Sequence, residues 1–218
     1  MARVLLRAIA ALAIAAPLHS SLFSQVVQAG RPSEASMAML PMTTSSAAAR
    51  MHAMLGQRAL ETNHAAEAAQ HFQQAIAADS MLAFAWLGAA NASTSFADYQ
   101  TRLSAAARLD EHATRAEQLQ IAIARKSIVN DLAGAEASAR ELVAAEPKNP
   151  RSYLALAGAQ QAMGREVEAR RTMERAIALA PSFSQTYRQL AYSYMQSQPT
   201  DGAKAGGHAM RSGVMSRF

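Results

Sequence analysis

The sequence repeats itself at a spacing of about 34 residues, and this period constrains the fold more than any other feature. Similar blocks begin at Ala49, Ala83, Ala116, Pro150 and Ser184. In two of them a small, a bulky and a second small residue recur at helical spacing, as Ala68, Phe72 and Ala75 and again as Ala169, Met173 and Ala176. A small residue allows two helices to cross closely, and a bulky one fills the adjacent groove. The period therefore predicts a stack of helix–turn–helix units.

Local signals also predict helices. Alanine, the best helix former, dominates long runs that contain few β-branched residues. Asn149-Pro150 is typical of a helix start and Gly164 of a helix end. Three capping boxes begin at Ser95, Thr114 and Ser182. No stretch alternates as a strand would. Helices are predicted over 49–61, 65–78, 82–92, 96–109, 114–129, 132–145, 150–163, 166–179 and 183–196.

These blocks resemble the tetratricopeptide repeat from Ala49 to about Met195. The fourth block fits best, with Tyr153, Leu156, Ala157, Ala169, Met173, Ala176 and Pro181 in place. The second departs most, because Arg102 stands where alanine is usual and Leu87-Gly88 lies two residues early. The resemblance implies an all-α fold, a right-handed superhelical solenoid of antiparallel helix pairs. The alternative is an alanine-rich helical bundle with accidental periodicity.

The first 29 residues resemble a secretory signal peptide. Arg3 and Arg7 precede an apolar stretch that is too short to span a bilayer, and Val27-Gln28-Ala29 resembles a cleavage site. We expect cleavage after Ala29 and a periplasmic or secreted protein. The alternative is an uncleaved anchor, the one case in which we expect contact with a membrane.

The remaining composition predicts the domain layout. Residues 30–48 are rich in Ser and Met and are expected to form a flexible leader. The repeat domain covers 49–196, and its units are 49–82, 83–115, 116–149, 150–183 and a partial 184–196. Residues 197–218 are Gly-rich and are expected to be a disordered tail. Because no second helix is evident after Met195, we expect Tyr187, Leu190 and Tyr194 to be partly uncovered.

Charge argues against a nucleic-acid partner. The formal net charge of +5 falls to +3 once Arg3 and Arg7 are removed, and many remaining cations alternate with acids along helices. The sequence contains no basic stripe interleaved with aromatic residues of the kind that single strands favour.

The sequence also lacks the motifs of common enzymes. It has no cysteine, no Gly-x-Ser-x-Gly elbow, no phosphate-binding glycine loop and no His-Glu-x-x-His pair. Asp110-Glu111-His112 is the tightest titratable cluster, and it falls between two predicted helices. We expect a protein that is not an enzyme and uses no cofactor.

Methionines near the start of the expected mature chain offer one weaker alternative, a Cu(I) site. Thioether and imidazole ligands suit Cu(I). The candidate ligands are Met37, Met39, Met42, Met51, His52 and Met54. Packing at the exposed end of the first repeat explains Met51 and Met54 more simply.

The resemblance implies that the first helix of each pair lines a concave groove. The residues at its binding positions are Arg50, Gln57, Asn91, Glu117, Gln120, Arg151, Gln161, Arg188 and Tyr192. This polar, partly cationic set suits an extended peptide, whose backbone needs hydrogen-bond partners.

We therefore predict an exported scaffold or adaptor that binds a protein or peptide partner in this groove. The alternative is structural: the terminal repeats dock on another copy of the chain or on a larger envelope complex.

Overall fold

The computed structural model describes residues 39–196, which lie within one compact unit of the chain, residues 32–218. The predicted signal peptide (1–29) and tail (197–218) lie outside the described residues. Within 39–196 the structure consists of nine α-helices and one short 3₁₀ helix, Asp110–His112, with no strand. This confirms the all-α prediction.

The helices follow the predicted ranges to within two residues at each end. Their bounds are α3 Ala47–Glu61, α4 Ala65–Ala78, α5 Ala83–Asn91, α6 Phe96–Arg108, α7 Arg115–Ile128, α8 Leu132–Ala145, α9 Pro150–Ala162, α10 Glu166–Leu179 and α11 Ser184–Gln196. The good agreement has a local cause, since capping side chains and turn residues set most helix ends.

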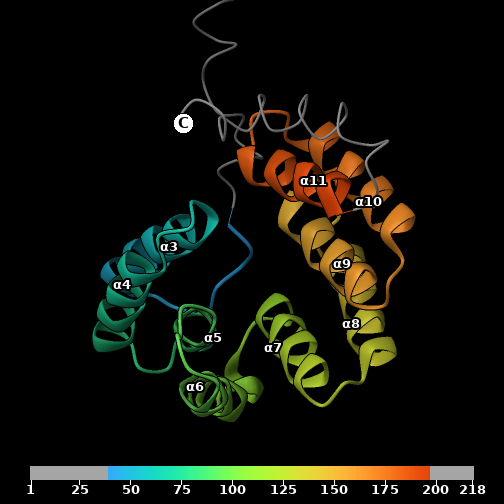
Figure 1. The fold of residues 1–218 in the computed structure, drawn as a ribbon. Coiled ribbons are helices and arrows are strands. Elements are labelled where there is room, and N and C mark those ends of the chain that lie inside the picture. Colours follow the sequence, from blue (N-terminus) through green and yellow to red (C-terminus); the bar gives the residue numbers. More distant parts are fainter. Residues whose placement is uncertain (1–38, 197–218) are drawn as a thin grey trace, which may run out of the picture. The chain divides into compact units, whose positions relative to one another are not determined.

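Successive helices pack as pairs, and the pairs stack side by side. Each first helix packs most extensively on the second helix of its own pair, and that second helix packs in turn on the first helix of the next pair. Figure 1 shows α3, α5, α7, α9 and α11 facing the interior of the stack, with α4, α6, α8 and α10 outside them. We call the surface of these five first helices the inner face.

Side chains cap three of the helices at residues that the sequence predicts as caps. Ser95 accepts the N–H of Asp98, and Asn149 accepts the N–H of Arg151 directly before Pro150. Thr114 and Glu117 form a complete capping box. Each of these contacts satisfies an N–H that the first helical turn leaves without a partner.

Three turns between paired helices use a left-handed residue. Gly164 has φ 73°, and the corresponding turns of the first and third pairs contain Asn63 (φ 67°) and Asn130 (φ 59°). Asparagine is one of the few residues with a side chain that tolerates this conformation.

Close helix crossings explain the glycines of the first two pairs. Phe72 of α4 is fully buried between α3 and α5. A Cβ atom at Gly88 would lie 2.2 Å from the Phe72 ring, and one at Gly56 would lie 3.0 Å from it. The early Gly88 of the irregular second block thus makes room for the bulky residue of the first.

The second block also accommodates its unusual arginine. Arg102 of α6 donates to the carbonyl of Ala89 at 2.9 Å and to Ser93 Oγ at 3.1 Å. These acceptors follow from the shortness of α5, because its last turn leaves carbonyls available.

The expectation that α11 leaves its aromatic residues partly uncovered is wrong. Tyr187 and Tyr194 are 6% and 8% exposed, and Leu190 is fully buried. Leu190 and Tyr194 pack in one cluster with residues of α9 and α10. Tyr192 and Met195 are the exposed large hydrophobic side chains of this helix.

Candidate binding groove

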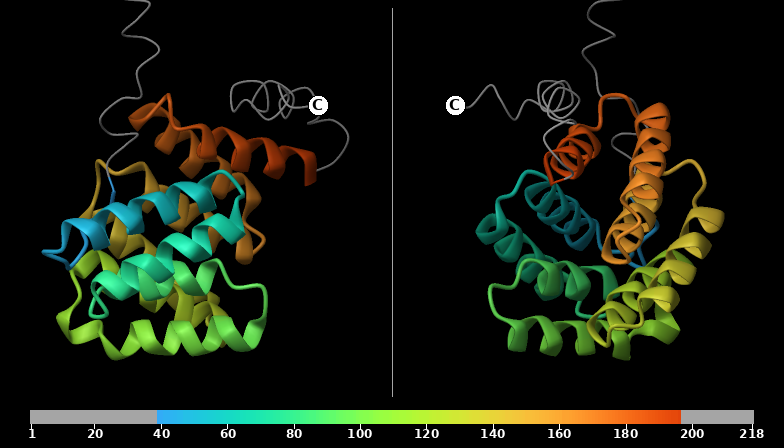
Figure 2. Two further views of the ribbon diagram at one scale, coloured as in Figure 1. Left: turned by 90° about the vertical axis from the view of Figure 1, so that its left-hand side faces the viewer. Right: turned by 45° about the vertical axis from the view of Figure 1, so that its right-hand side comes forward.

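Residues 39–46 form an extended stretch, the leader segment, that lies along the inner face. Figure 1 shows this segment passing between α3–α5 and α7–α9, and the right-hand view in Figure 2 shows it between α3 and the orange helices. The sequence predicts a flexible leader over 30–48, but this part of it makes specific contacts with helices far away in the sequence.

The carboxylate of Glu117 anchors the leader segment to α7. Its Oε2 accepts both the backbone N–H of Thr43, at 3.0 Å, and the Thr43 hydroxyl, at 2.7 Å. Its Oε1 accepts the N–H of Phe84 at 3.2 Å, and the capping residue Thr114 donates to the carbonyl of Pro41 at 3.0 Å. The fully buried Glu117 therefore joins α5, α7 and the leader segment.

Two apolar side chains of the leader segment fill the inner face on either side of this anchor. Leu40, 4% exposed, packs with Ala116 and Leu119 of α7 and with Leu142 of α8. Met42 packs in the cluster of α3, α4 and α5. One short extended segment thus contacts the first, second and third helix pairs.

Glu61 at the end of α3 joins the first pair to the last helices. Its carboxylate accepts from Arg151 Nε at 2.7 Å and from Gln57 Nε2 at 3.0 Å, and its backbone carbonyl accepts from Arg188. Arg151 also lies over the ring of Phe183, 4.7 Å from its centre. Burial lowers the pKa of the Arg188 guanidinium, and the charge of Glu61 partly offsets this effect.

An open pocket of about 620 Å³ adjoins this junction, and we call it the methionine pocket. Met39, Met51, Met54 and Phe183 supply much of its apolar wall, and its charged lining residues are Arg50, Arg58, Glu61 and Arg151. Met51 and Met54 are 51% and 42% exposed. Its volume lies in the range of small-molecule and side-chain sites.

The structure gathers four of the nine sequence-predicted groove residues. Gln57, Arg151 and Arg188 meet at Glu61, and Arg50 lines the methionine pocket beside them. Sequence reasoning missed Glu61 itself, because only the approach of α3 to α9 and α11 brings an acid to these cations. No local pattern signals such a contact.

The other five predicted residues do not join this cluster at Glu61. Glu117 binds the leader segment, and Gln120 bonds within its own helix to the carbonyl of Ala116. Gln161 lies 3.4 Å from Glu166 at the end of α9. Asn91 and Tyr192 are exposed on α5 and α11.

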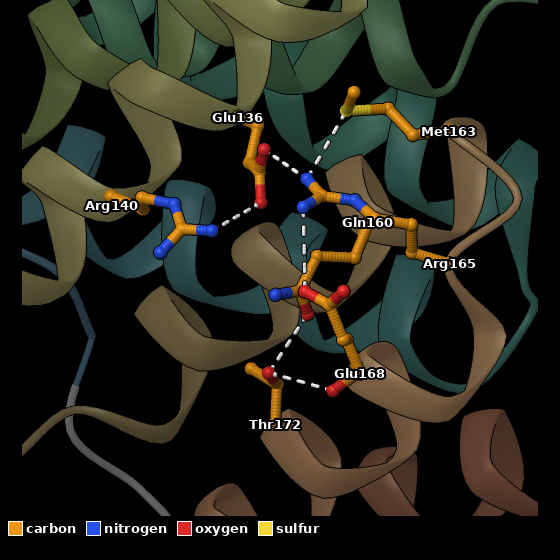
Figure 3. A network of polar contacts seen from close by, with 7 residues as sticks. All are labelled: Glu136, Arg140, Gln160, Met163, Arg165, Glu168 and Thr172. Carbon is orange, nitrogen blue, oxygen red and sulfur yellow. Dashed lines mark hydrogen bonds and ion pairs between the residues drawn. The ribbon is translucent and has the colours of Figure 1, made fainter.

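A polar network joins α9, the helix that carries Arg151, to α8 and α10. Figure 3 shows Glu136 of α8 between Arg140 and Arg165, which precedes α10. The Thr172 hydroxyl donates to Gln160 Oε1 at 2.8 Å, which ties α10 to α9. Burial raises the pKa of the Glu136 carboxyl, but hydrogen bonds and charge from Arg165 and Arg140 outweigh burial and lower it.

A second hollow, of about 750 Å³, lies between α6 and α7. Its lining includes Arg108, Arg125, Lys126 and Val129, and none of the predicted groove residues. We therefore place the candidate site at the inner face, where predicted residues and an apolar pocket coincide.

The described residues proposed as Cu(I) ligands have different surroundings. Met42 is buried in the core, and Met51 and Met54 line the pocket. His52 and His71 lie with their Nδ1 atoms 3.4 Å apart. Met37 lies outside the described residues, and the copper alternative stays a prediction.

Within residues 39–196, no helix is both long and apolar enough to cross a membrane.

Comparisons with known proteins agree with this architecture. The tetratricopeptide repeat family model matches residues 129–205. A search of curated proteins finds no match. Among solved structures, PilW, a widely conserved type IV pilus biogenesis factor, is 16% identical, with 77% of this chain and 79% of that chain covered and a TM-score of 0.50. MamA from Desulfovibrio magneticus RS-1 is 17% identical, with 80% and 98% covered and a TM-score of 0.44. The family match and the likeness to PilW, together with the paired helices of residues 39–196, show that the chain has the all-α, right-handed solenoid fold of tetratricopeptide repeats.

Proposed function

We propose that this protein is a non-enzymatic scaffold that binds a segment of a partner protein on its inner face. The observation that carries the proposal is the methionine pocket, an open apolar surface beside a groove that already holds an extended stretch of chain. Methionine side chains are flexible and polarizable, and they adapt to differently shaped apolar partners.

The charges around the pocket indicate the chemistry of the partner. Glu61 already pairs with Arg151, whereas Arg50 and Arg58 are exposed at the same pocket. Arg50 donates to the carbonyl of Thr44, a contact that leaves its charge uncompensated. The pocket therefore suits a large apolar side chain with an acidic residue next to it.

Selection from a displayed random-peptide library tests this proposal. The full chain is expected to enrich peptides that combine an apolar anchor with acidic neighbours. Their affinity should fall at least about tenfold for Met54→Asp, because a carboxylate in the pocket wall opposes both features of the peptide. Met81→Asp is the matched control, since Met81 is 50% exposed outside the pocket. Failure to enrich any peptide, or equal loss in both variants, would refute the proposal.

We further propose that the mature scaffold is exported and starts at Gly30. The support is the sequence of residues 1–29 alone, with its Arg3, Arg7 and apolar stretch. Mass spectrometry of the protein purified from an expressing bacterium should give the mass of residues 30–218. The mass of the uncleaved chain would support an anchor instead.

A second candidate function is docking of α11 on another copy of the chain. Tyr192 and Met195 are 60% and 70% exposed on this last described helix. Light scattering across a dilution series should then show a dimer that Tyr192→Ser and Met195→Ser together abolish. A protein that stays monomeric at every concentration would exclude this candidate.

A further inference from the structure

The leader segment lies on the inner face in the way an extended ligand would. It contributes two apolar side chains, Leu40 and Met42, and it uses its backbone at Pro41 and Thr43 for hydrogen bonds to α7 and the residue that caps it. We propose that this segment is a displaceable intramolecular ligand, and that the groove beneath it accepts a partner segment of the same chemistry. This inference rests on the proposed function and specifies which partner segments the inner face binds.

Each position of the leader segment has a distinct recognition element. The Leu40 position is a buried apolar site on α7 and α8, and the Met42 position is a second apolar site on α3–α5. The Thr43 position faces Glu117, whose Oε2 accepts both an N–H and a hydroxyl. A matching partner segment therefore has four consecutive positions. A large apolar residue takes the place of Leu40, any residue follows it, an apolar residue takes the place of Met42, and Thr or Ser takes the place of Thr43.

The same geometry excludes an acidic residue at the Thr43 position. Glu117 is fully buried, so a second carboxylate there would face it without solvent between them. Proline fits at position 41, because only its carbonyl is used and its N–H is not needed.

The surroundings of the leader segment allow it to leave. The methionine pocket lies on one part of it, and another hollow of about 370 Å³ is lined by Met39–Met42 together with Arg50, Met54 and Glu146. Helix α3 does not depend on residues 39–43, since Ser46 at the end of the segment is its N-cap residue and accepts the N–H of Ala49. Release would therefore open the groove without removing the start of α3.

The covalent link gives the segment an advantage over a free competitor. A short flexible tether holds a ligand at an effective concentration of the order of millimolar. For a free peptide with a dissociation constant near 10–100 µM, this corresponds to roughly 10–100-fold weaker apparent binding to the wild type than to a chain whose own segment is disabled.

The test compares two full-length chains, the wild type and a variant with Leu40→Ser, Met42→Ser and Thr43→Ala. The probe is a fluorescently labelled, end-blocked peptide with the sequence of residues 37–45, followed by fluorescence anisotropy. The variant is expected to bind it at least about tenfold more tightly than the wild type, and to gain thermal stability when the peptide is added. A control peptide with Thr43→Glu should bind at least about tenfold more weakly than the parent peptide.

Three results would overturn the inference: equal binding of the peptide by both chains, no binding by the variant whether or not it stays folded, or equal binding of the Thr43→Glu peptide. Size-exclusion chromatography of a mixture of the two chains tests whether the leader segment of a second copy occupies the groove. A stable heterodimer would assign the groove to a second copy of the chain and contradict a separate partner. Failure of this test would not by itself refute the methionine pocket, because Met51→Asp tests that pocket separately: Met51 lines it and does not line the hollow around residues 39–42.

Discussion

Single residues set how closely the helices approach, and Gly88 shows this most clearly. We expect Gly88→Ala to destabilise the fold by about 1–3 kcal/mol, because the added Cβ would lie 2.2 Å from the ring of Phe72, which is itself fully buried. This cost exceeds the roughly 0.5–1 kcal/mol that alanine gains over glycine inside a helix. Urea denaturation measures the difference.

Gly158 provides the matched control. A Cβ atom there has no neighbour within 4 Å, and the residue lies inside α9. Gly158→Ala should therefore be neutral or stabilising by up to about 1 kcal/mol. Equal changes in the free energy of unfolding for the two substitutions would contradict the close packing of Phe72 against Gly88.

Glu136 makes the stability depend on pH. Its folded pKa lies below its ordinary value, so the stabilisation it provides is complete above the unfolded pKa of about 4.3 and is lost as the pH falls through the lower folded pKa. Glu136→Gln should cost about 1–2 kcal/mol at pH 7, and the difference from the wild type should shrink below about pH 4. Denaturation at a series of pH values provides the check.

Glu141 is the control for this prediction, because its pair with Arg115 is exposed on both sides, 57% and 61%. Glu141→Gln should change stability by less than about 1 kcal/mol at pH 7. A difference for Glu136→Gln that stayed constant from pH 7 to pH 3 would show that the ionised carboxylate is not what stabilises α8 against Arg165.

At the residue scale, repeat periodicity explains only part of the candidate site. The sequence placed Gln57, Arg151 and Arg188 on the groove because their positions within the repeat are fixed by periodicity. It did not predict that they meet at Glu61, or that Glu117 binds the leader segment, because these contacts join residues far apart in the chain. Periodicity places a residue on a face but does not choose its partner.

At the scale of elements, local chemistry made the helices predictable. The capping residues Ser95, Thr114 and Asn149 act as the sequence indicated. The left-handed turns at Asn63 and Asn130 could have been found as well, since each takes the place that Gly164 has in its own repeat.

The left-handed conformation of Asn130, in the turn between α7 and α8, can be tested by substitution. Asn130→Ala should destabilise the chain by about 1–2 kcal/mol, because alanine lacks the side-chain hydrogen bonding that makes φ 59° tolerable, whereas Asn130→Gly should be neutral or slightly stabilising. Thermal unfolding followed by circular dichroism distinguishes them. Equal melting temperatures for both variants would argue against a left-handed turn at this position.

The leader segment is the element whose contacts could not be predicted from composition. Ser, Thr and Met suggested flexibility throughout 30–48, yet Leu40 and Met42 are buried and Thr43 is hydrogen bonded. An extended segment without periodicity carries no local signal for the surface it contacts, so its placement depends on the assembled groove.

For the whole molecule, the contacts at Glu61 add a long-range contribution to the free energy of unfolding that a simple row of repeats lacks. In a linear stack each repeat contacts only its neighbours, so stability is a sum of neighbouring interactions. Here Glu61 of the first pair contacts Arg151 of the fourth pair and Arg188 of the last described helix, α11. The ends of the stack are thereby coupled.

A double-mutant cycle of Glu61→Gln and Arg151→Gln should reveal this coupling. We expect an interaction energy of about 1–3 kcal/mol, because the two side chains are only 9% and 11% exposed. The exposed pair Arg115–Glu141 provides the comparison, with an expected value below about 1 kcal/mol. An interaction energy near zero for Glu61 and Arg151 would mean that the ends of the stack fold independently.

The measurement that tests the central claim most directly is a methyl NMR titration of the full chain, with labelled methionines and a library-selected peptide. Met51 and Met54 in the pocket report on the proposed site, and the exposed Met81 and Met195 report on surfaces outside it. Binding at the inner face predicts shifts for Met51 and Met54 and none for Met81 and Met195. Shifts confined to Met81 or Met195 would contradict it.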